Sequence, residues 1–108
     1  MINLTDFISQ YRMLSTANVS DGLDRISFNG APHGIGPLWD ACGKIVGPAC
    51  TLKLVGLDEA DESPVLGTLR AITEGKAGDV LVIDHGGRTD INSYGGGAGF
   101  TTLHKGLG

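Results

Sequence analysis

A short apolar run, introduced by a turn, limits the folds open to this chain more than any other feature. Gly78 and Asp79 lead into the sequence Val80-Leu81-Val82-Ile83-Asp84. A continuous apolar run of this length is typical of a strand that is covered on both faces in a parallel sheet. Parallel strands are joined by crossover connections, which are usually helical. Residues 80–84 therefore predict a strand of an α/β domain.

Two helices are predicted near the N-terminus. The first has one apolar stripe at i, i+3, i+4 and i+7, with Asn3 or Thr5 as its cap; the stripe is Leu4, Phe7, Ile8 and Tyr11. The second has apolar residues at positions 19, 23 and 26, follows the capping candidates Ser15 and Thr16, and is weakened by Gly22.

The middle of the chain is predicted to be a loop followed by β structure. Residues 29–43 are rich in glycine, proline and polar residues, and Leu38 and Trp39 are expected to hold this loop against the core. Residues 44–55 have β-type composition. Pro48 cannot donate a ladder hydrogen bond, so we expect two short strands, or one bent strand, at an edge or bulge.

Two more helices flank the strand at residues 80–84. Ser63 and Pro64 begin the first, which Gly75 ends. The second covers residues 100–105, begins from the glycine run at 95–97 and ends at Gly106. The predicted order is α, α, β, α, β, α. A further strand is expected after Gly108.

Composition excludes several classes of protein. A length of 108 residues and a hydrophobic share of 41% fit one globular domain without a membrane partner, and the N-terminus lacks a signal-peptide pattern. A cytoplasmic setting is expected. The net charge of -4 has the wrong sign for a nucleic-acid binder. Cys42 and Cys50 form no C-x-x-C pair, so neither a zinc knuckle nor a redox motif is indicated.

Four segments in order carry a resemblance to a known family. They are STANVSDGLD (residues 15–24), GKIVGPACT (43–51), AGDVLVID (77–84) and SYGGG (93–97). Together they resemble the family that contains the regulator of ribonuclease activity A and the 4-hydroxy-4-methyl-2-oxoglutarate/oxaloacetate lyases, which are class II pyruvate aldolases. The likeness runs over roughly residues 12–108, and it corresponds to the N-terminal half of the family's domain.

The resemblance implies a three-layer β/β/α domain of the swivelling type, assembled as a homo-oligomeric trimer or hexamer. Here the domain is expected to be truncated, with residues 1–108 forming one partial domain. In the lyases a divalent metal, usually Mg²⁺, binds a small pyruvate-type oxo acid and stabilises the enolate formed when the C–C bond breaks.

The family's carboxylate-binding turn maps onto four consecutive residues: Gly95, Gly96, Gly97 and Ala98. Physical chemistry supports this assignment, because free N–H groups at a helix start attract anions and glycine lets a ligand approach closely. The family's arginine and metal-ordering aspartate lie in a G-x-V-x-D-G-x-x-R-D segment that these 108 residues lack, and Gly96 stands where the lyases commonly carry an acid. We therefore assign no catalytic residue and no metal ligand.

Other readings of the glycine run are open or excluded. One alternative interpretation is that the run is only a flexible turn that lets the helix pack. A dinucleotide fingerprint is excluded, because Phe100 stands where a third glycine or alanine belongs. A P-loop is also excluded, because His104 and Lys105 follow Gly99 without the required second glycine or the Ser or Thr for magnesium.

Several polar residues outside that run have a structural and a functional reading. His33, His85 and His104 are too scattered to predict a metal site, although His85 follows a predicted strand at its carboxyl end. Asp21 and Asp24 fit helix capping and solvation, or acid–base chemistry. An acidic group predicts a solvated turn: Asp58, Glu59, Asp61 and Glu62. Arg88 is a candidate substitute for the family's arginine.

The leading functional hypothesis is a metal-dependent C–C lyase for pyruvate-type oxo acids, of the aldolase or oxaloacetate decarboxylase kind, inactive as this isolated chain. A second hypothesis is a non-catalytic regulator that binds a ribonuclease. A third is a fragment without independent activity that pairs through an exposed sheet edge.

Overall fold

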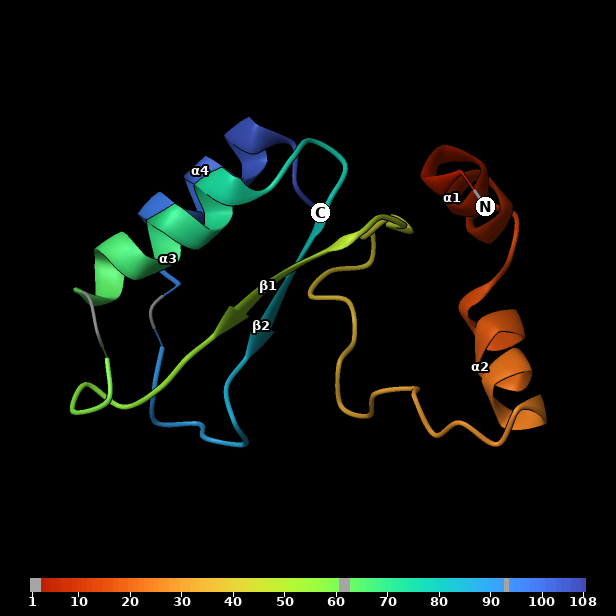
Figure 1. Cartoon of the computed structure of the whole chain (residues 1–108), viewed down its shortest axis with the longest axis horizontal. Helices are drawn as coiled ribbons and strands as arrows, with labels where there is room; N and C mark the ends of the chain where they lie inside the picture. The colour runs from red at the N-terminus through yellow and green to blue at the C-terminus, as the bar shows by residue number, and fades with distance from the viewer. Residues whose placement is uncertain (1–2, 61–62, 93) are drawn as a thin grey trace. The chain divides into compact units, whose positions relative to one another are not determined.

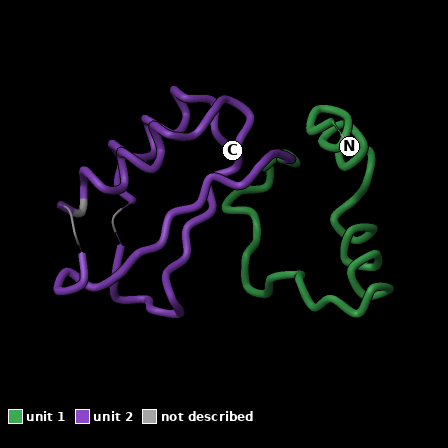
Figure 2. The backbone as a smooth tube through the Cα atoms, viewed as in Figure 1, with its two compact units in different colours: residues 1–45 green, residues 46–108 purple. Residues whose placement is uncertain are grey.

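The computed structural model describes residues 3–60, 63–92 and 94–108. The chain forms two compact units, Met1–Ile45 and Val46–Gly108, which are coloured separately in Figure 2. Among the described residues, no helix has the length and apolar character needed to cross a membrane.

Unit 1 contains the two predicted N-terminal helices. Helix α1 (Leu4–Arg12) is capped by the Asn3 side chain, which accepts a hydrogen bond from the Thr5 N–H at 2.9 Å. Helix α2 (Thr16–Arg25) begins with a capping box, in which the side chains of Ser15 and Asn18 each accept the other residue's backbone N–H. Both helices are therefore confirmed, together with their predicted caps.

The loop that follows α2 is held to α1 within unit 1. The Lys44 ammonium donates hydrogen bonds to the carbonyl oxygens of Arg12 and Leu14, just after α1. Leu38 and Trp39 make no buried contact within the described part of unit 1. Their expected contact with the core stays a prediction.

Unit 2 is built on two parallel strands. Strand β1 (Ala49–Lys53) pairs with β2 (Val80–Asp84) in a register that runs from Ala49 opposite Val80 to Lys53 opposite Asp84. Helix α3 (Pro64–Glu74) makes the crossover, and α4 (Gly96–Lys105) follows β2 (Figure 1). The predicted element order and the α/β class are confirmed.

The predicted β structure at residues 44–55 is shorter than expected. Residues 44–48 are irregular, and a single strand forms, as in one of the two expected arrangements. Pro48 has no N–H and takes part only through its carbonyl oxygen, which accepts the Val80 N–H at 2.8 Å. Ladder pairing therefore begins at Ala49, after the proline.

The core of unit 2 lies between the sheet and two helices on one face. Ile72 of α3 is fully buried beside Ala98 of α4 and Leu107, with Leu81 of β2 and Tyr94 packed against them. On the other face Val82 is 46% exposed. The apolar run at 80–84 thus forms a strand covered on one face within this unit, which by itself has two layers. The three-layer swivelling arrangement stays a prediction.

The segment after α4 returns to the sheet. Gly106 ends the helix in a left-handed conformation with a φ of 75°. Leu81 then donates its N–H to the Gly108 carbonyl oxygen at 2.9 Å, and the Gly108 N–H bonds to the Asp79 carbonyl oxygen at 2.8 Å. These groups of β2 face away from β1, since Val80 bonds to Pro48. Gly108 thus lies beside Val80 in the hydrogen-bond pattern of parallel strands. A further strand after Gly108 stays a prediction.

A close backbone approach fixes where β1 begins. A Cβ atom added at Gly47 would lie far inside contact distance of the Gly78 carbonyl oxygen, whose residue has a left-handed φ of 92°. A carbonyl oxygen in a backbone turn cannot move aside as a flexible side chain does. Residue 47 must therefore be glycine for β1 and β2 to pair in this register.

The substitution Gly47→Ala is expected to destabilise the chain by about 1–3 kcal/mol, since the added methyl group must force the two backbone segments apart. Urea unfolding followed by circular dichroism measures this change. The control is Gly43→Ala, where the added Cβ meets nothing within 4 Å. Equal stability of the two variants would contradict the proposed constraint.

Candidate functional site

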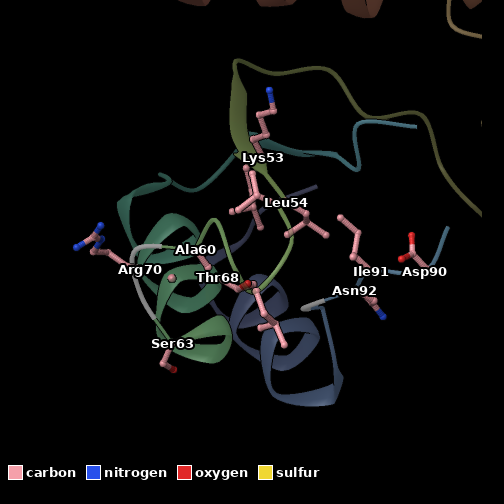
Figure 3. Close-up of a pocket in the computed structure, with 13 residues that line it drawn as sticks. Lys53, Leu54, Ala60, Ser63, Thr68, Arg70, Asp90, Ile91 and Asn92 are labelled. Atoms are coloured by element: carbon pink, nitrogen blue, oxygen red, sulfur yellow. The ribbon is translucent and has the colours of Figure 1, made fainter. Parts of the chain in front are cut away.

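A pocket lies at the edge of the sheet where both parallel strands end. It has a volume of about 410 Å³ and is lined by the end of β1, by α3, and by the loops after β1 and β2 (Figure 3). Ligands of open α/β sheets bind at the carboxyl ends of the strands, in pockets of roughly 300–1,000 Å³. Position and size therefore make this edge the first candidate for a binding site.

The loop after β2 is braced by an ion pair. Arg88 donates from Nε to one oxygen of Asp90 at 3.0 Å and from a terminal nitrogen to the other at 2.6 Å. These hydrogen bonds raise the pKa of the Arg88 guanidinium and lower the pKa of the Asp90 carboxyl. The Arg88 guanidinium is thus paired with Asp90 in its own loop. This pairing argues against Arg88 replacing the family's carboxylate-binding arginine.

Residues between this loop and α4 fix the start of the helix. The Asn92 side chain accepts the Tyr94 N–H at 2.9 Å, and the Tyr94 hydroxyl lies 3.1 Å from the Thr102 hydroxyl on α4. The residue just before the glycine run is therefore held both through its backbone and through its ring. Gly95, the N-cap residue, lies in extended conformation and has no side chain with which to cap the helix.

No contact with the described residues, and no backbone strain, accounts for the glycines of this helix start. Gly95, Gly96 and Gly97 all lie outside the left-handed region that favours glycine. A Cβ added at any of them would meet nothing within 4 Å. Other residues would fit these positions, and most would stabilise a helix better than glycine.

The helix start is therefore open to a ligand. The first N–H groups of a helix have no partner within it and carry partial positive charge. Gly99 makes the first intrahelical hydrogen bond here, to the Gly95 carbonyl oxygen at 3.0 Å. Ala98 is buried, so its side chain packs into the core of unit 2. Exposed N–H groups without covering side chains suit a carboxylate.

The remaining candidates from the sequence lie in separate places. His85 is half-buried directly after β2, and its carbonyl oxygen accepts the Arg88 N–H at 3.1 Å. His104 stacks on Phe100 on the exposed side of α4, with ring centroids 6.2 Å apart. Asp21 and Asp24 are exposed on α2 in unit 1, and their acid–base role stays a prediction.

A metal does not fit the side chains that are described. Among residues 3–60, 63–92 and 94–108, no group of three or more His, Cys, Asp or Glu side chains could hold an ion. Asp58 and Glu59 are exposed, as a solvated turn predicts, while Asp61 and Glu62 lie outside the described residues. We derive no reaction step through a metal from this chain.

Comparison with known proteins identifies the family. Residues 16–108 match the RraA-like family, described as Aldolase/RraA. The chain therefore belongs to the RraA-like family, as the four sequence segments indicate.

The chain is also similar to a curated protein of this kind. The chain is 37% identical over 79 residues to a protein of Halalkalibacterium halodurans that carries the provisional name 4-hydroxy-4-methyl-2-oxoglutarate aldolase. The match covers 73% of this chain and 33% of the relative, so the chain spans about a third of that protein's length. No solved structure matches the chain.

Sequence reasoning missed the pocket, the ion pair and the role of Asn92. The pair had a signal in the spacing of Arg88 and Asp90, two positions apart in a glycine-rich turn. The role of Asn92 also had a signal in the sequence, since asparagine side chains often accept the backbone N–H two residues ahead. The pocket had no signal in the sequence, because the two loops that line it meet only in the folded chain.

The Arg88–Asp90 pair predicts a measurable titration. Asp90 has a lowered pKa, so the pair contributes stability above the ordinary carboxyl pKa and loses it as pH falls through the lowered value. Substituting Arg88→Gln is expected to raise the Asp90 midpoint toward its ordinary value. Carboxyl NMR titration measures this, with Arg12→Gln in unit 1 as control. An unchanged midpoint would show that the pair does not form in solution.

Proposed function

We propose that residues 95–98 bind the carboxylate of a pyruvate-type 2-oxo acid, as part of a C–C lyase of the aldolase or oxaloacetate decarboxylase kind. The observation that carries the proposal is the set of three glycines at an exposed helix start that the chain's own packing does not require. Membership of the RraA-like family and the name of the relative support the same chemistry.

The free energies available at the start of α4 indicate that this helix start alone binds a carboxylate weakly. A helix start contributes about 0.3–1 kcal/mol to an exposed anion through its dipole, and a hydrogen bond to a charged group contributes about 1.5–3 kcal/mol. Two such hydrogen bonds and the dipole sum to about 3–7 kcal/mol, and the free-energy cost of association reduces the net value. A dissociation constant of about 1 mM, which corresponds to about 4 kcal/mol, lies in the lower part of this range. The chain's part is therefore to hold and orient the carboxylate, while tight binding requires further groups.

The proposal assigns no turnover to the isolated chain. The family implies Mg²⁺ or another divalent metal and an Arg-Asp pair, and the segment that bears this pair does not occur in these 108 residues. Gly96 can neither transfer a proton nor order a metal. The Arg-Asp pair that acts on the bound oxo acid would therefore come from a segment outside residues 1–108. We further propose the family's trimeric or hexameric assembly.

A second function is favoured by the same glycine. Where the lyases commonly carry an acid, Gly96 offers only backbone, which suits a non-catalytic regulator that binds a ribonuclease as well as it suits an incomplete enzyme. Mixing the chain with an endoribonuclease and following RNA cleavage separates these functions. Inhibition that persists at saturating pyruvate would favour the regulator.

The carboxylate site predicts where pyruvate acts on the chain. In ¹⁵N-resolved NMR, pyruvate is expected to shift the amide signals of residues 95–98 with a dissociation constant of about 1 mM. Substituting Gly97→Val should weaken binding about tenfold, because a Cβ in a helix tilts toward the N-terminus, where the ligand lies.

The matched control is Gly22→Val in α2, which is also a helical glycine whose added Cβ meets nothing within 4 Å. Both substitutions should leave folding intact. Equal pyruvate affinity in the two variants would contradict a carboxylate site at the start of α4.

Turnover has its own prediction. The 108-residue chain is expected to decarboxylate oxaloacetate no faster than chain-free buffer, both in the presence of Mg²⁺ and in the presence of chelator. The uncatalysed rate is subtracted under each condition, because free Mg²⁺ also promotes the reaction. The assay follows pyruvate formation with a coupled dehydrogenase. Turnover that requires Mg²⁺ would show that the chain assembles a working site without the Arg-Asp segment, and would overturn this part of the proposal.

A further inference from the structure

We propose that Tyr94 and Thr102 are positioning residues for the carboxylate site at residues 95–98. Neither side chain is assigned a contact with the ligand. Their part is to hold the glycine run in one conformation, so that its N–H groups are already in place when a carboxylate arrives. This inference rests on the proposed function and adds to it the residues that prepare the site.

A binding turn made of three glycines has a cost in conformational entropy. Glycine has more backbone freedom than any other residue, and each residue that a ligand must order lowers the affinity by about fivefold or more. A turn that is already ordered in the free protein avoids this loss. A site at residues 95–98 therefore depends on the groups that hold the two ends of the run.

Two hydrogen bonds in sequence join the two ends of the glycine run. The Tyr94 hydroxyl donates to the Thr102 hydroxyl oxygen at 3.1 Å, and the Thr102 hydroxyl donates to the Ala98 carbonyl oxygen at 2.8 Å. Tyr94 directly precedes the three glycines, and Ala98 directly follows them. We name these two hydrogen bonds the hydroxyl bridge. The bridge ties the residue before the run to the helix that contains it.

The hydroxyl bridge lies in the core of unit 2. Thr102 is 8% exposed, and Tyr94 packs against the cluster that contains Ala98 and Ile72. In such low-dielectric surroundings two linked hydrogen bonds strengthen each other. Packing alone does not require the tyrosine hydroxyl, because the Thr102 hydroxyl already has the Ala98 carbonyl oxygen as its acceptor. A phenylalanine at position 94 would fill the same space and leave the Thr102 donor paired.

Asn92 holds Tyr94 through its backbone. The Asn92 side-chain oxygen accepts the Tyr94 N–H at 2.9 Å, and its side-chain nitrogen donates to the Tyr94 carbonyl oxygen at 3.4 Å. The Tyr94 carbonyl and the Gly95 N–H belong to one planar peptide group. Asn92 therefore sets the direction of the first N–H of the run, while the hydroxyl bridge sets the place of Tyr94 along α4.

The experiment titrates the ¹⁵N-labelled 108-residue chain with pyruvate and repeats the titration with Tyr94→Phe. This substitution removes one oxygen atom and keeps the ring in the core. Pyruvate affinity is expected to fall about fivefold, the equivalent of one further residue to be ordered on binding. The backbone order parameters of residues 95–97 should fall as well in the ligand-free variant. A merely structural role would lower stability and change neither quantity in the folded chain.

Thr102 provides a second test. Thr102→Ser keeps the hydroxyl and should keep the affinity, whereas Thr102→Val keeps the shape and should weaken binding as much as Tyr94→Phe does. The double variant of Tyr94→Phe with Thr102→Val should bind no more weakly than either single variant, because both remove the same bridge. The matched control is Tyr11→Phe in α1, whose ring packs on Phe7 within unit 1.

The outcomes separate this inference from the proposed function. Shifts at residues 95–98 with equal affinity in Tyr94→Phe and Tyr11→Phe would overturn the positioning role and leave the carboxylate site standing. No shifts there in the unsubstituted chain would overturn the carboxylate site and with it this inference. Should Tyr94→Phe fail to fold, the Thr102 pair decides, since equal affinity of Thr102→Ser and Thr102→Val would overturn the positioning role by itself.

Discussion

The parallel pairing of β1 with β2 is the constraint on which the rest of unit 2 depends. Two parallel strands cannot be joined by a tight hairpin, so the chain must cross over, and α3 makes that connection. Both strands then end at the same edge of the sheet, and both following loops begin there. The pocket, the Arg88–Asp90 pair and the start of α4 are consequences of that one geometry.

The elements that sequence predicted correctly have local signals. Asn3, Ser15 and Ser63 each cap a helix through a side chain that bonds a backbone N–H two or three residues ahead, and Gly106 ends one through its own conformation. Sequence also predicted that Leu38 and Trp39 reach a core. That contact stays a prediction, because the core lies in unit 2 and burial depends on residues far along the chain.

The features of the candidate site also differ in whether a local sequence signal predicts them. The glycines at 95–97 were predicted from the resemblance and from helix-end chemistry, and the structure adds that no packing or backbone strain demands them. The pocket could not be predicted, because Leu57 and Ile91 are brought together by strand pairing and not by sequence spacing. In the sequence, Arg88 is a candidate to bind a substrate carboxylate. In the structure, its guanidinium donates hydrogen bonds to both carboxylate oxygens of Asp90.

The return of the chain to β2 after α4 has a consequence for assembly. Because Gly108 bonds to Asp79 and Leu81, the backbone groups there no longer offer a template for an added strand. A second polypeptide that pairs with this side of β2 would therefore have to bond farther along the strand than Leu81. The side of β2 that faces away from β1 is thus already engaged at Asp79 and Leu81 by the chain itself.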